Sequence, residues 1–303
     1  MSRAAIGEAV VSAESEDGFR LDGLLVEPTR GMQGTAVLVV PGLYAAYHDP
    51  PYPDLARALA RRGHPTLVGN TRGHDFGAVL RRADGSIVPG GGGWEELAEC
   101  PRDVGGWLGF LEARSFGRVV LLGHSLGARK AAYSLAVAPD RRVVGLAVAS
   151  GFAGPAASPD PEILCLARKL TAEGRGRDLL PWPAVGCSMS ARTYLDHEDP
   201  DSPFLSVFRS NGPRYLEPFV ARVAVPILAL FGAEECGPDG NDRSAELETI
   251  RRGATASPSV EKLIIPDLGH LYVGRERAVA DAVVNWQRKV AGTRRGRSND
   301  GSA

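Results

Sequence analysis

Cysteine is scarce in this sequence, with four residues in a chain of 303. The four are widely separated and form no Cys-x-x-Cys pair: Cys100, Cys165, Cys187 and Cys236. Disulfide frameworks and structural zinc sites need cysteines at close, regular spacings, and the histidines show no metal-ligand spacing either. We therefore expect reduced thiols in a cytoplasmic protein, with no metal site.

Long apolar runs and an excess of charge of either sign are also absent. No stretch reaches the roughly eighteen consecutive apolar residues typical of a transmembrane helix, and residues 1–8 lack the apolar segment of a signal peptide. Lys and Arg number 35 against 36 Asp and Glu, a net charge of −1, whereas nucleic-acid-binding proteins usually have a basic excess. We expect neither a membrane nor a nucleic acid as a partner.

Hydrophobic residues, in contrast, make up 44% of the chain and fall into short runs that alternate with helical patterns. Continuous apolar runs, typical of buried parallel strands, occupy residues 35–40, 65–69, 119–122, 143–149, 225–231 and 260–265. Helical spacing occurs at 54–62, 96–113, 128–136, 245–252 and 275–290. Two alternating segments, 10–15 and 19–27, predict an antiparallel hairpin at the start. The fold class is therefore α/β, with a mostly parallel central sheet and helices on both faces.

Three segments do not follow this alternation. Residues 152–222 are rich in proline, with short helical pieces near 162–173 and 189–195 and no long apolar strand. We interpret them as a small lid inserted between two strands, over the carboxyl edge of the sheet where ligands bind in α/β folds. Residues 81–93 predict a flexible loop or a small hairpin. Residues 293–303 predict a disordered tail, which leaves residues 1–292 as one domain.

The sequence Gly123-His-Ser-Leu-Gly127 lies between an apolar run and a helical segment. Strand, tight turn and helix are the context of the G-x-S-x-G nucleophile elbow. In that motif the serine is held in a strained conformation with its hydroxyl exposed, and the flanking glycines avoid collisions of a Cβ with the strand and the helix. An ordinary glycine-rich turn is the alternative. We interpret His124, beside the serine, as structural rather than as a second base.

A serine hydroxyl is a weak nucleophile that needs a base and an orienting carboxylate. In this fold class the order along the chain is serine, acid, histidine, with the histidine after the last strand. Both later positions are filled, by Gly232-Ala-Glu-Glu235 after one apolar run and by Gly269-His270 after another. A surface histidine at the start of a helix is the alternative for His270.

With these motifs, residues 20–291 resemble the α/β-hydrolase superfamily, and the lid segment 167–181 resembles a poorly characterised branch of it. The resemblance implies a catalytic triad of Ser125, Glu235 and His270, in which glutamate stands where aspartate is commoner. The other candidates for the acid are Glu234, Asp239 and Asp242. The stretch at residues 70–75 differs from the family's D-x-R-G-H-G pattern, so no catalytic role is carried over to it.

An oxyanion hole needs two backbone N–H donors aimed at the developing negative charge. One is expected from Leu126, the residue after the nucleophile. The other is expected from the loop after Val40, at Leu43 or Tyr44. Family members often have His-Gly in this loop, where this chain has Pro41-Gly42. A plain strand-to-helix turn is the alternative.

The sequence thus predicts a soluble serine hydrolase that cleaves a carboxylic ester, thioester or lactone through an acyl-enzyme on Ser125, without a metal or organic cofactor. Its partner is a small-molecule acyl substrate, and a homo-oligomer is compatible with the composition. The side chains expected near the substrate are Tyr44, His124, Trp182, Tyr194, Phe204 and Phe208. Two alternatives stay open: an acyl-transferring or cyclising enzyme of a biosynthetic pathway with the same triad, and a non-catalytic ligand-binding protein on a hydrolase scaffold.

Overall fold

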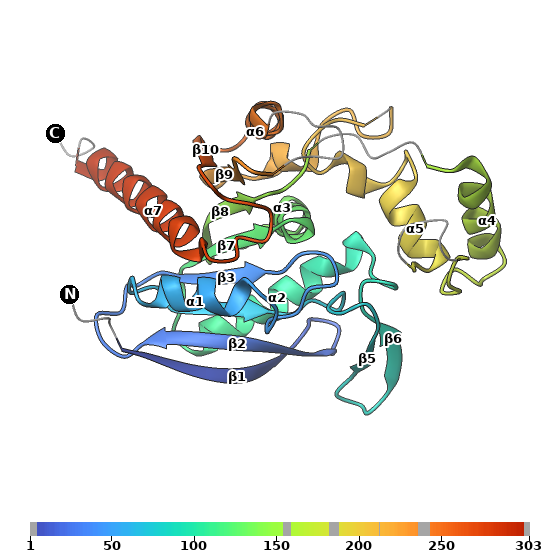
Figure 1. The fold of residues 1–303 in the computed structure, drawn as a ribbon, viewed down its shortest axis with the longest axis horizontal. Helices are drawn as coiled ribbons and strands as arrows, with labels where there is room; N and C mark the ends of the chain where they lie inside the picture. Colours follow the sequence, from blue (N-terminus) through green and yellow to red (C-terminus); the bar gives the residue numbers. More distant parts are fainter. Residues whose placement is uncertain (1–4, 154–158, 182–187, 212, 236–242, 300–303) are drawn as a thin grey trace.

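The computed structural model describes residues 5–153, 159–181, 188–211, 213–235 and 243–299, with the backbone alone for 292–299 (Figure 1). The strands are β1 (Ile6–Glu14), β2 (Arg20–Pro28), β3 (Ala36–Val40), β4 (Thr66–Gly69), β5 (Ala78–Arg81), β6 (Ile87–Gly90), β7 (Val119–His124), β8 (Val143–Ala149), β9 (Ile227–Gly232) and β10 (Val260–Ile265). The α-helices are α1 (Tyr52–Ala60), α2 (Cys100–Ala113), α3 (Leu126–Val137), α4 (Pro161–Ala172), α5 (Ala191–Glu198), α6 (Arg243–Gly253) and α7 (Glu276–Asn299). Short 3₁₀ helices are η1 (Leu97–Glu99), η2 (Pro203–Ser206) and η3 (Phe219–Arg222).

Eight strands form the central sheet, in the order β1-β2-β4-β3-β7-β8-β9-β10. β1 and β2 make the antiparallel hairpin expected from residues 10–27, and β2 also runs antiparallel to β4. From β4 to β10 every neighbouring pair is parallel. The predicted α/β class with a mostly parallel sheet is therefore confirmed, and the carboxyl ends of β3, β7, β8, β9 and β10 meet at one edge.

Side chains alternate between two apolar cores along each buried strand, as the period of two in a strand requires. In β7, Leu121 faces one core while Val120 and Leu122 face the other. The first core contains Trp107 and is covered by α2, α3 and α6; the second contains Trp286 and is covered by α1 and α7 (Figure 1). Covering both faces removes the apolar strands from water. This burial stabilises the fold by roughly 25 cal/mol for each Å² of apolar surface that is buried.

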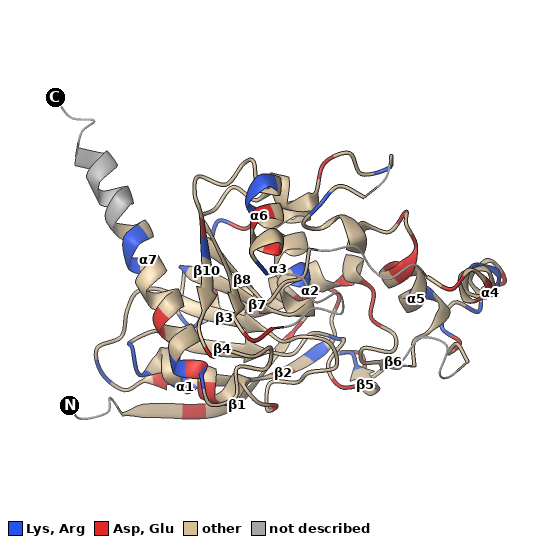
Figure 2. Cartoon of the chain, turned by 45° about the horizontal axis from the view of Figure 1, so that its top comes forward, with Lys and Arg blue, Asp and Glu red and all other residues tan. Residues whose placement is uncertain are grey.

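Acidic and basic residues are interspersed along the chain rather than gathered on one element (Figure 2). Of the described cysteines, Cys100 is buried and Cys165 exposed, and both are free thiols. None of the described helices is both long enough and apolar enough to cross a membrane.

The insertion at residues 152–222 leaves the sheet after β8 and returns at β9, and it holds α4, α5, η2 and η3. α4 and α5 share a small apolar core of their own. Polar contacts join α5 to the segment before α2: Ser190 N–H donates to the Gly93 carbonyl oxygen over 2.7 Å, and Leu97 N–H donates to Asp196 Oδ2 over 2.7 Å. The insertion is thus anchored to the main domain through backbone donors at both ends of this contact.

The Asp196 carboxylate makes this anchor sensitive to pH. Burial raises its pKa to about 7, opposed by the Leu97 N–H and reinforced by Glu96, Glu95 and Glu99, whereas an ordinary aspartate titrates near ~4. Because the folded-state pKa is the higher one, protonated Asp196 favours the folded state. Its contribution to the free energy of unfolding is complete below about pH 4 and is lost as the pH rises through the folded-state pKa of about 7. We expect Asp196→Asn, which keeps an oxygen acceptor for Leu97, to lose less melting temperature than the wild type between these two pH values. Thermal melts at both would show it, and equal losses would contradict it.

Three sequence predictions can be compared with the structure in detail. Of the two alternatives for residues 81–93, a flexible loop or a small hairpin, the structure has the hairpin, in which β5 pairs antiparallel with β6. The helix expected at 96–113 begins with η1, and Pro101 then lies in the first turn of α2, where its missing N–H has no intrahelical partner to lose. α7 continues to Asn299 and so includes residues 293–299 of the predicted disordered tail. Its last turns are rich in arginine, a good helix former, and residues 293–299 contain a single glycine, Gly296.

Candidate active site

Ser125 lies at the carboxyl end of β7, between the strand and the first residue of α3. Its φ of 55° and ψ of −121° are unusual for a residue with a side chain, and its N–H donates to the Ala149 carbonyl oxygen over 2.9 Å. A Cβ on Gly123 would lie 2.2 Å from the Gly127 carbonyl oxygen, and one on Gly127 would lie 2.1 Å from that of Val40. The turn therefore needs glycine at both positions, as the elbow motif predicts.

The structure brings Ser125, His270 and Glu235 together from three neighbouring loops at the carboxyl edge. His270 Nε2 lies 3.0 Å from Ser125 Oγ, and His270 Nδ1 lies 2.9 Å from Glu235 Oε2. A carboxylate only accepts, so Nδ1 carries the proton and donates it to Glu235. Nε2 is then the unprotonated nitrogen and accepts the hydrogen bond from the serine hydroxyl, which is the arrangement that a general base requires.

The carboxylate of Glu235 is buried and fully engaged. Its Oε1 accepts hydrogen bonds from Ser150 Oγ and from Gly232 N–H, both over 2.6 Å. Burial would raise its pKa, but the hydrogen bonds from His270, Ser150 and Gly232 outweigh burial and leave the pKa below its ordinary value. The group is therefore ionised near neutral pH. The neighbouring Glu234 is exposed, and the two other candidates, Asp239 and Asp242, lie outside the described residues.

Two residues beside the acid were missed in the sequence. Ser150 directly follows β8, and its hydroxyl also shares a hydrogen bond with the Tyr272 hydroxyl. Both residues have positive φ, 51° for Ser150 and 57° for Tyr272. Burial raises the pKa of Tyr272 well above its ordinary value, so it stays protonated. The signal for Ser150 was its position after an apolar strand, at the same sheet edge as Ser125.

The expected oxyanion donors belong to two segments next to Ser125, the start of α3 and the loop after β3. Leu126 is the first residue of α3, so its N–H has no intrahelical acceptor. The loop after β3 passes directly beside the nucleophile, because a Cβ on Gly42 would lie 3.1 Å from Ser125 Cβ. Leu43 follows Gly42 and is exposed. The Tyr44 ring points instead to the β5–β6 side, with its centroid 5.8 Å from that of Phe76.

The side chains expected to contact substrate are mostly used for packing. His124, Tyr194 and Phe208 are 2%, 4% and 0% exposed, so in this structure they pack inside the protein. Tyr194 packs between α4 and α5, and Phe208 packs in the core that contains Trp107. Phe204 is half-buried and stacks on His197 with centroids 4.2 Å apart. Trp182 lies outside the described residues.

An aromatic residue that the sequence analysis did not select stands closer to the chemistry. Phe152 follows Ser150 by two residues, and its ring centroid lies 5.4 Å from that of His270. It is half-buried and lies at the start of the insertion. The insertion thus reaches the catalytic edge through its first residues.

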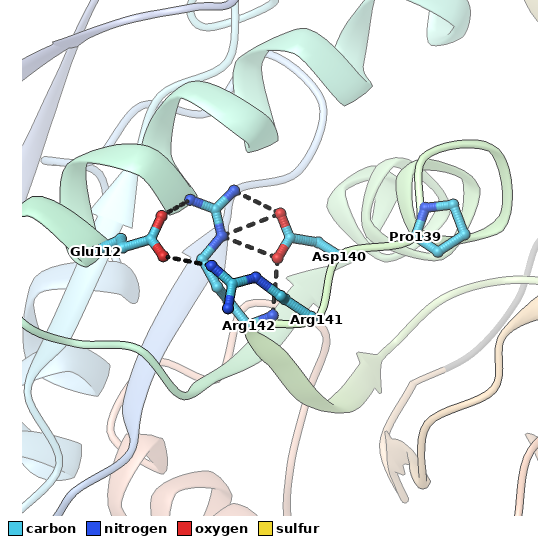
Figure 3. Close-up of a pocket in the computed structure, with 5 residues that line it drawn as sticks. All are labelled: Glu112, Pro139, Asp140, Arg141 and Arg142. Atoms are coloured by element: carbon cyan, nitrogen blue, oxygen red, sulfur yellow. Dashed lines mark hydrogen bonds and ion pairs between the residues drawn. The ribbon is translucent and has the colours of Figure 1, made fainter.

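A cleft of about 410 Å³ lies elsewhere, lined by Glu112, Pro139, Asp140, Arg141 and Arg142 (Figure 3). It borders the amino end of β8, opposite the edge that carries Ser125. Its charges pair with one another: Arg142 contacts Glu112 over 2.8 Å and also Asp140. Within the described part of the chain, no three His, Cys, Asp or Glu side chains lie close enough together to hold a metal ion.

Comparison with known proteins shows the family and the fold of the chain. The model of the alpha/beta hydrolase family matches residues 37–282. The chain belongs to this family. No curated protein matches the sequence. Among solved structures, Est1E from Butyrivibrio proteoclasticus with ferulic acid bound is similar to this alpha/beta hydrolase with a TM-score of 0.61 at 16% identity, over 93% of this chain and 100% of the other.

Two further solved structures share the fold. The hydrolase GrgF from Penicillium sp. sh18 has a TM-score of 0.61 at 15% identity, over 94% of this chain and 97% of the other. The esterase Pf2001 from Pyrococcus furiosus has a TM-score of 0.55 at 14% identity, over 92% of this chain and 93% of the other. At these identities the likeness shows the fold, so the chemistry has to be argued from the residues of this chain.

Proposed function

We propose that this alpha/beta hydrolase is a serine hydrolase that cleaves a carboxylic ester, thioester or lactone through an acyl-enzyme on Ser125. The observation that carries the proposal is the unbroken hydrogen-bonded series from Ser125 Oγ through His270 to Glu235. A strained serine at a strand-to-helix turn, a base with its free nitrogen toward that serine, and a buried ionised carboxylate behind the base are the parts of an acyl-transfer site.

In this mechanism Ser125 Oγ attacks the carbonyl carbon of the substrate while His270 Nε2 takes the hydroxyl proton. Glu235 holds the Nδ1–H tautomer and stabilises the imidazolium that forms. The N–H groups of Leu126 and Leu43 donate to the oxyanion. His270 then gives its proton to the leaving group, and a water molecule activated by the same histidine cleaves the acyl-enzyme and releases the acid.

In this proposal the insertion supplies part of the acyl-binding wall, through Phe152 beside His270 and through Phe204. An apolar or aromatic acyl group suits these rings. A substrate panel should therefore contain aliphatic and aromatic esters, matching thioesters and lactones. Feruloyl esters belong in it because Est1E has been solved with ferulic acid bound.

A fluorophosphonate probe tests the nucleophile directly. We expect the probe to label Ser125 and no other serine, because the elbow and the base activate this hydroxyl alone. Mass spectrometry of the labelled peptide identifies the site, and heat-unfolded protein is the control that should stay unlabelled. Folded protein without a label on Ser125 would contradict the proposed function.

A further inference from the structure

A second hydrogen-bonded series passes behind the nucleophile and does not touch Ser125. The N–H of Gly42 donates to the Tyr52 hydroxyl over 2.8 Å. The Tyr52 hydroxyl lies 2.8 Å from His124 Nδ1, and His124 Nε2 lies 2.8 Å from the carbonyl oxygen of His270. The series therefore begins one residue before Leu43, the proposed oxyanion donor, and ends on the backbone of the proposed base.

The chemistry of the groups fixes the direction of each bond. The His270 carbonyl can only accept, so His124 Nε2 carries a proton and donates it. Burial, reinforced by the nearby His270, lowers the pKa of His124 to about 4, so the ring is neutral near pH ~7 and Nδ1 keeps its lone pair. Nδ1 then accepts from the Tyr52 hydroxyl, which is free to accept from Gly42. Burial also raises the pKa of Tyr52, so the phenol stays protonated.

The position of these residues makes the series a brace rather than a part of the reaction. Tyr52 is the first residue of α1, and His124 is the last residue of β7, directly before the nucleophile. Both are only 2% exposed. Both ring nitrogens of His124 are used within the protein, so it has none left to act as a base on a substrate.

We propose that Tyr52 and His124 are positioning residues that hold the oxyanion loop in register with the catalytic histidine. The proposal rests on the proposed serine hydrolase mechanism. In that mechanism the Leu43 N–H donates to the oxyanion in the same step in which His270 takes the proton of Ser125. Pro41 has neither an N–H nor a polar side chain, so Gly42 N–H is the first backbone donor of this loop, and Tyr52 fixes it. A shift of about 1 Å in such a pair costs up to roughly 100-fold in rate.

Kinetics of Tyr52→Phe form the first test. The variant keeps the ring and removes the hydroxyl, so Gly42 and His124 both lose a partner. We expect kcat to fall by about 10- to 100-fold with KM within about twofold, because the loss falls on the transition state. Tyr47→Phe is the matched control, since Tyr47 lies in the same loop and its hydroxyl is outside the series. Unchanged kcat in folded Tyr52→Phe, or a rise in KM alone, would overturn the proposal.

Two substitutions at His124 separate positioning from simple packing. His124→Gln keeps an N–H that reaches the His270 carbonyl, whereas His124→Leu keeps none. We expect kcat to fall less for glutamine than for leucine, with the rate of fluorophosphonate labelling at Ser125 falling in the same order. Equal kcat values for the two folded variants would count against the brace. If neither variant folds, the Tyr52→Phe result decides alone.

Nitrogen-15 NMR of histidine-labelled protein tests the series without any substrate. We expect the ring of His124 to be neutral with a slowly exchanging Nε2–H. Its resonances are assigned as those that are absent in His124→Gln. Its Nδ1 resonance should move in Tyr52→Phe as the hydrogen bond is lost. A His124 that is protonated near pH ~7, or protonated on Nδ1, overturns the proposal. An absent label on Ser125 with this spectrum intact would instead refute the proposed function.

Discussion

Replacing Glu235 with glutamine is expected to lower kcat by about 10²- to 10⁴-fold, with little change in KM. Glu235 uses both oxygens as acceptors: Oε1 for Ser150 and Gly232, and Oε2 for His270. An amide has one acceptor oxygen and one NH₂ group. The NH₂ group therefore replaces either Oε1 or Oε2, and there its N–H donors meet the N–H or O–H donors that the carboxylate accepts from. The substitution also removes the negative charge that favours the Nδ1–H tautomer of His270 and its protonated form during the reaction.

Glu234→Gln is the matched control, because it makes the same chemical change on the adjacent residue. Glu234 is exposed, whereas Glu235 is 5% exposed. We expect Glu234→Gln to keep kcat within about twofold of the wild type, as for most surface substitutions away from a site. Steady-state kinetics with a chromogenic ester compares the two. A large loss in Glu234→Gln, or none in Glu235→Gln, would assign the acid elsewhere in the loop after β9.

The sheet and the nucleophile turn could be predicted because their signals are local. Runs such as residues 119–122 are apolar at every position. This pattern is typical of a strand in a parallel sheet that is covered on both faces. The close approaches of Gly123 and Gly127 to backbone atoms explain why the motif can be recognised from a few residues. The acid and the histidine were then located from the chain order of this fold class, in which each of them follows a later strand.

The partners of these residues could not be predicted, because they depend on how distant loops meet. Nothing in the spacing of Tyr52 and His124, or of Ser150 and Tyr272, indicates a hydrogen bond across 72 or 122 positions. The role of the aromatic residues in the insertion could not be predicted for a related reason. Composition does not distinguish an aromatic ring that lines a pocket from one such as Phe208, which is fully buried. Packing decides between the two roles.

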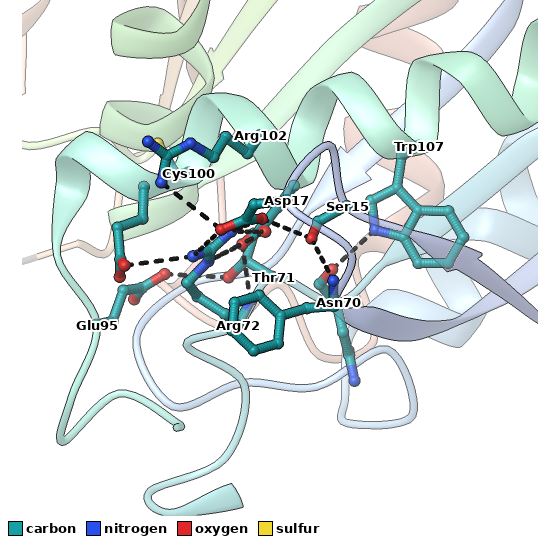
Figure 4. A network of polar contacts seen from close by, with 12 residues as sticks. Ser15, Asp17, Asn70, Thr71, Arg72, Glu95, Cys100, Arg102 and Trp107 are labelled. Carbon is teal, nitrogen blue, oxygen red and sulfur yellow. Dashed lines mark hydrogen bonds and ion pairs between the residues drawn. The ribbon is translucent and has the colours of Figure 1, made fainter. Parts of the chain in front are cut away.

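A buried ion pair beside the elbow helix also had no sequence signal. Lys130 on α3 is 2% exposed, and its Nζ lies 2.6 Å from Oε1 of Glu95, which is 4% exposed. Nζ also donates to Thr71 Oγ1 over 3.0 Å, and the Thr71 hydroxyl donates to Glu95 over 3.1 Å. Thr71 and Glu95 border the larger network around Arg72 and Asp17 (Figure 4). The three side chains thus join α3 to the segments after β4 and before α2.

Replacing Lys130 with methionine is expected to destabilise the protein by about 3–5 kcal/mol, because it leaves the Glu95 carboxylate buried without its cation. The double variant Lys130→Met with Glu95→Gln should recover a large part of this loss, since no uncompensated charge is then buried. Lys169→Met is the control: Lys169 is 69% exposed and lies 4.0 Å from Glu173, and an exposed pair of this kind contributes about 0–1 kcal/mol. Urea unfolding of the wild type, of the single variants Lys130→Met, Glu95→Gln and Lys169→Met, and of the double variant measures these differences. If the double variant were as unstable as the sum of its single substitutions, Lys130 and Glu95 would not be coupled, and the helix that carries the nucleophile would be held by its apolar face instead.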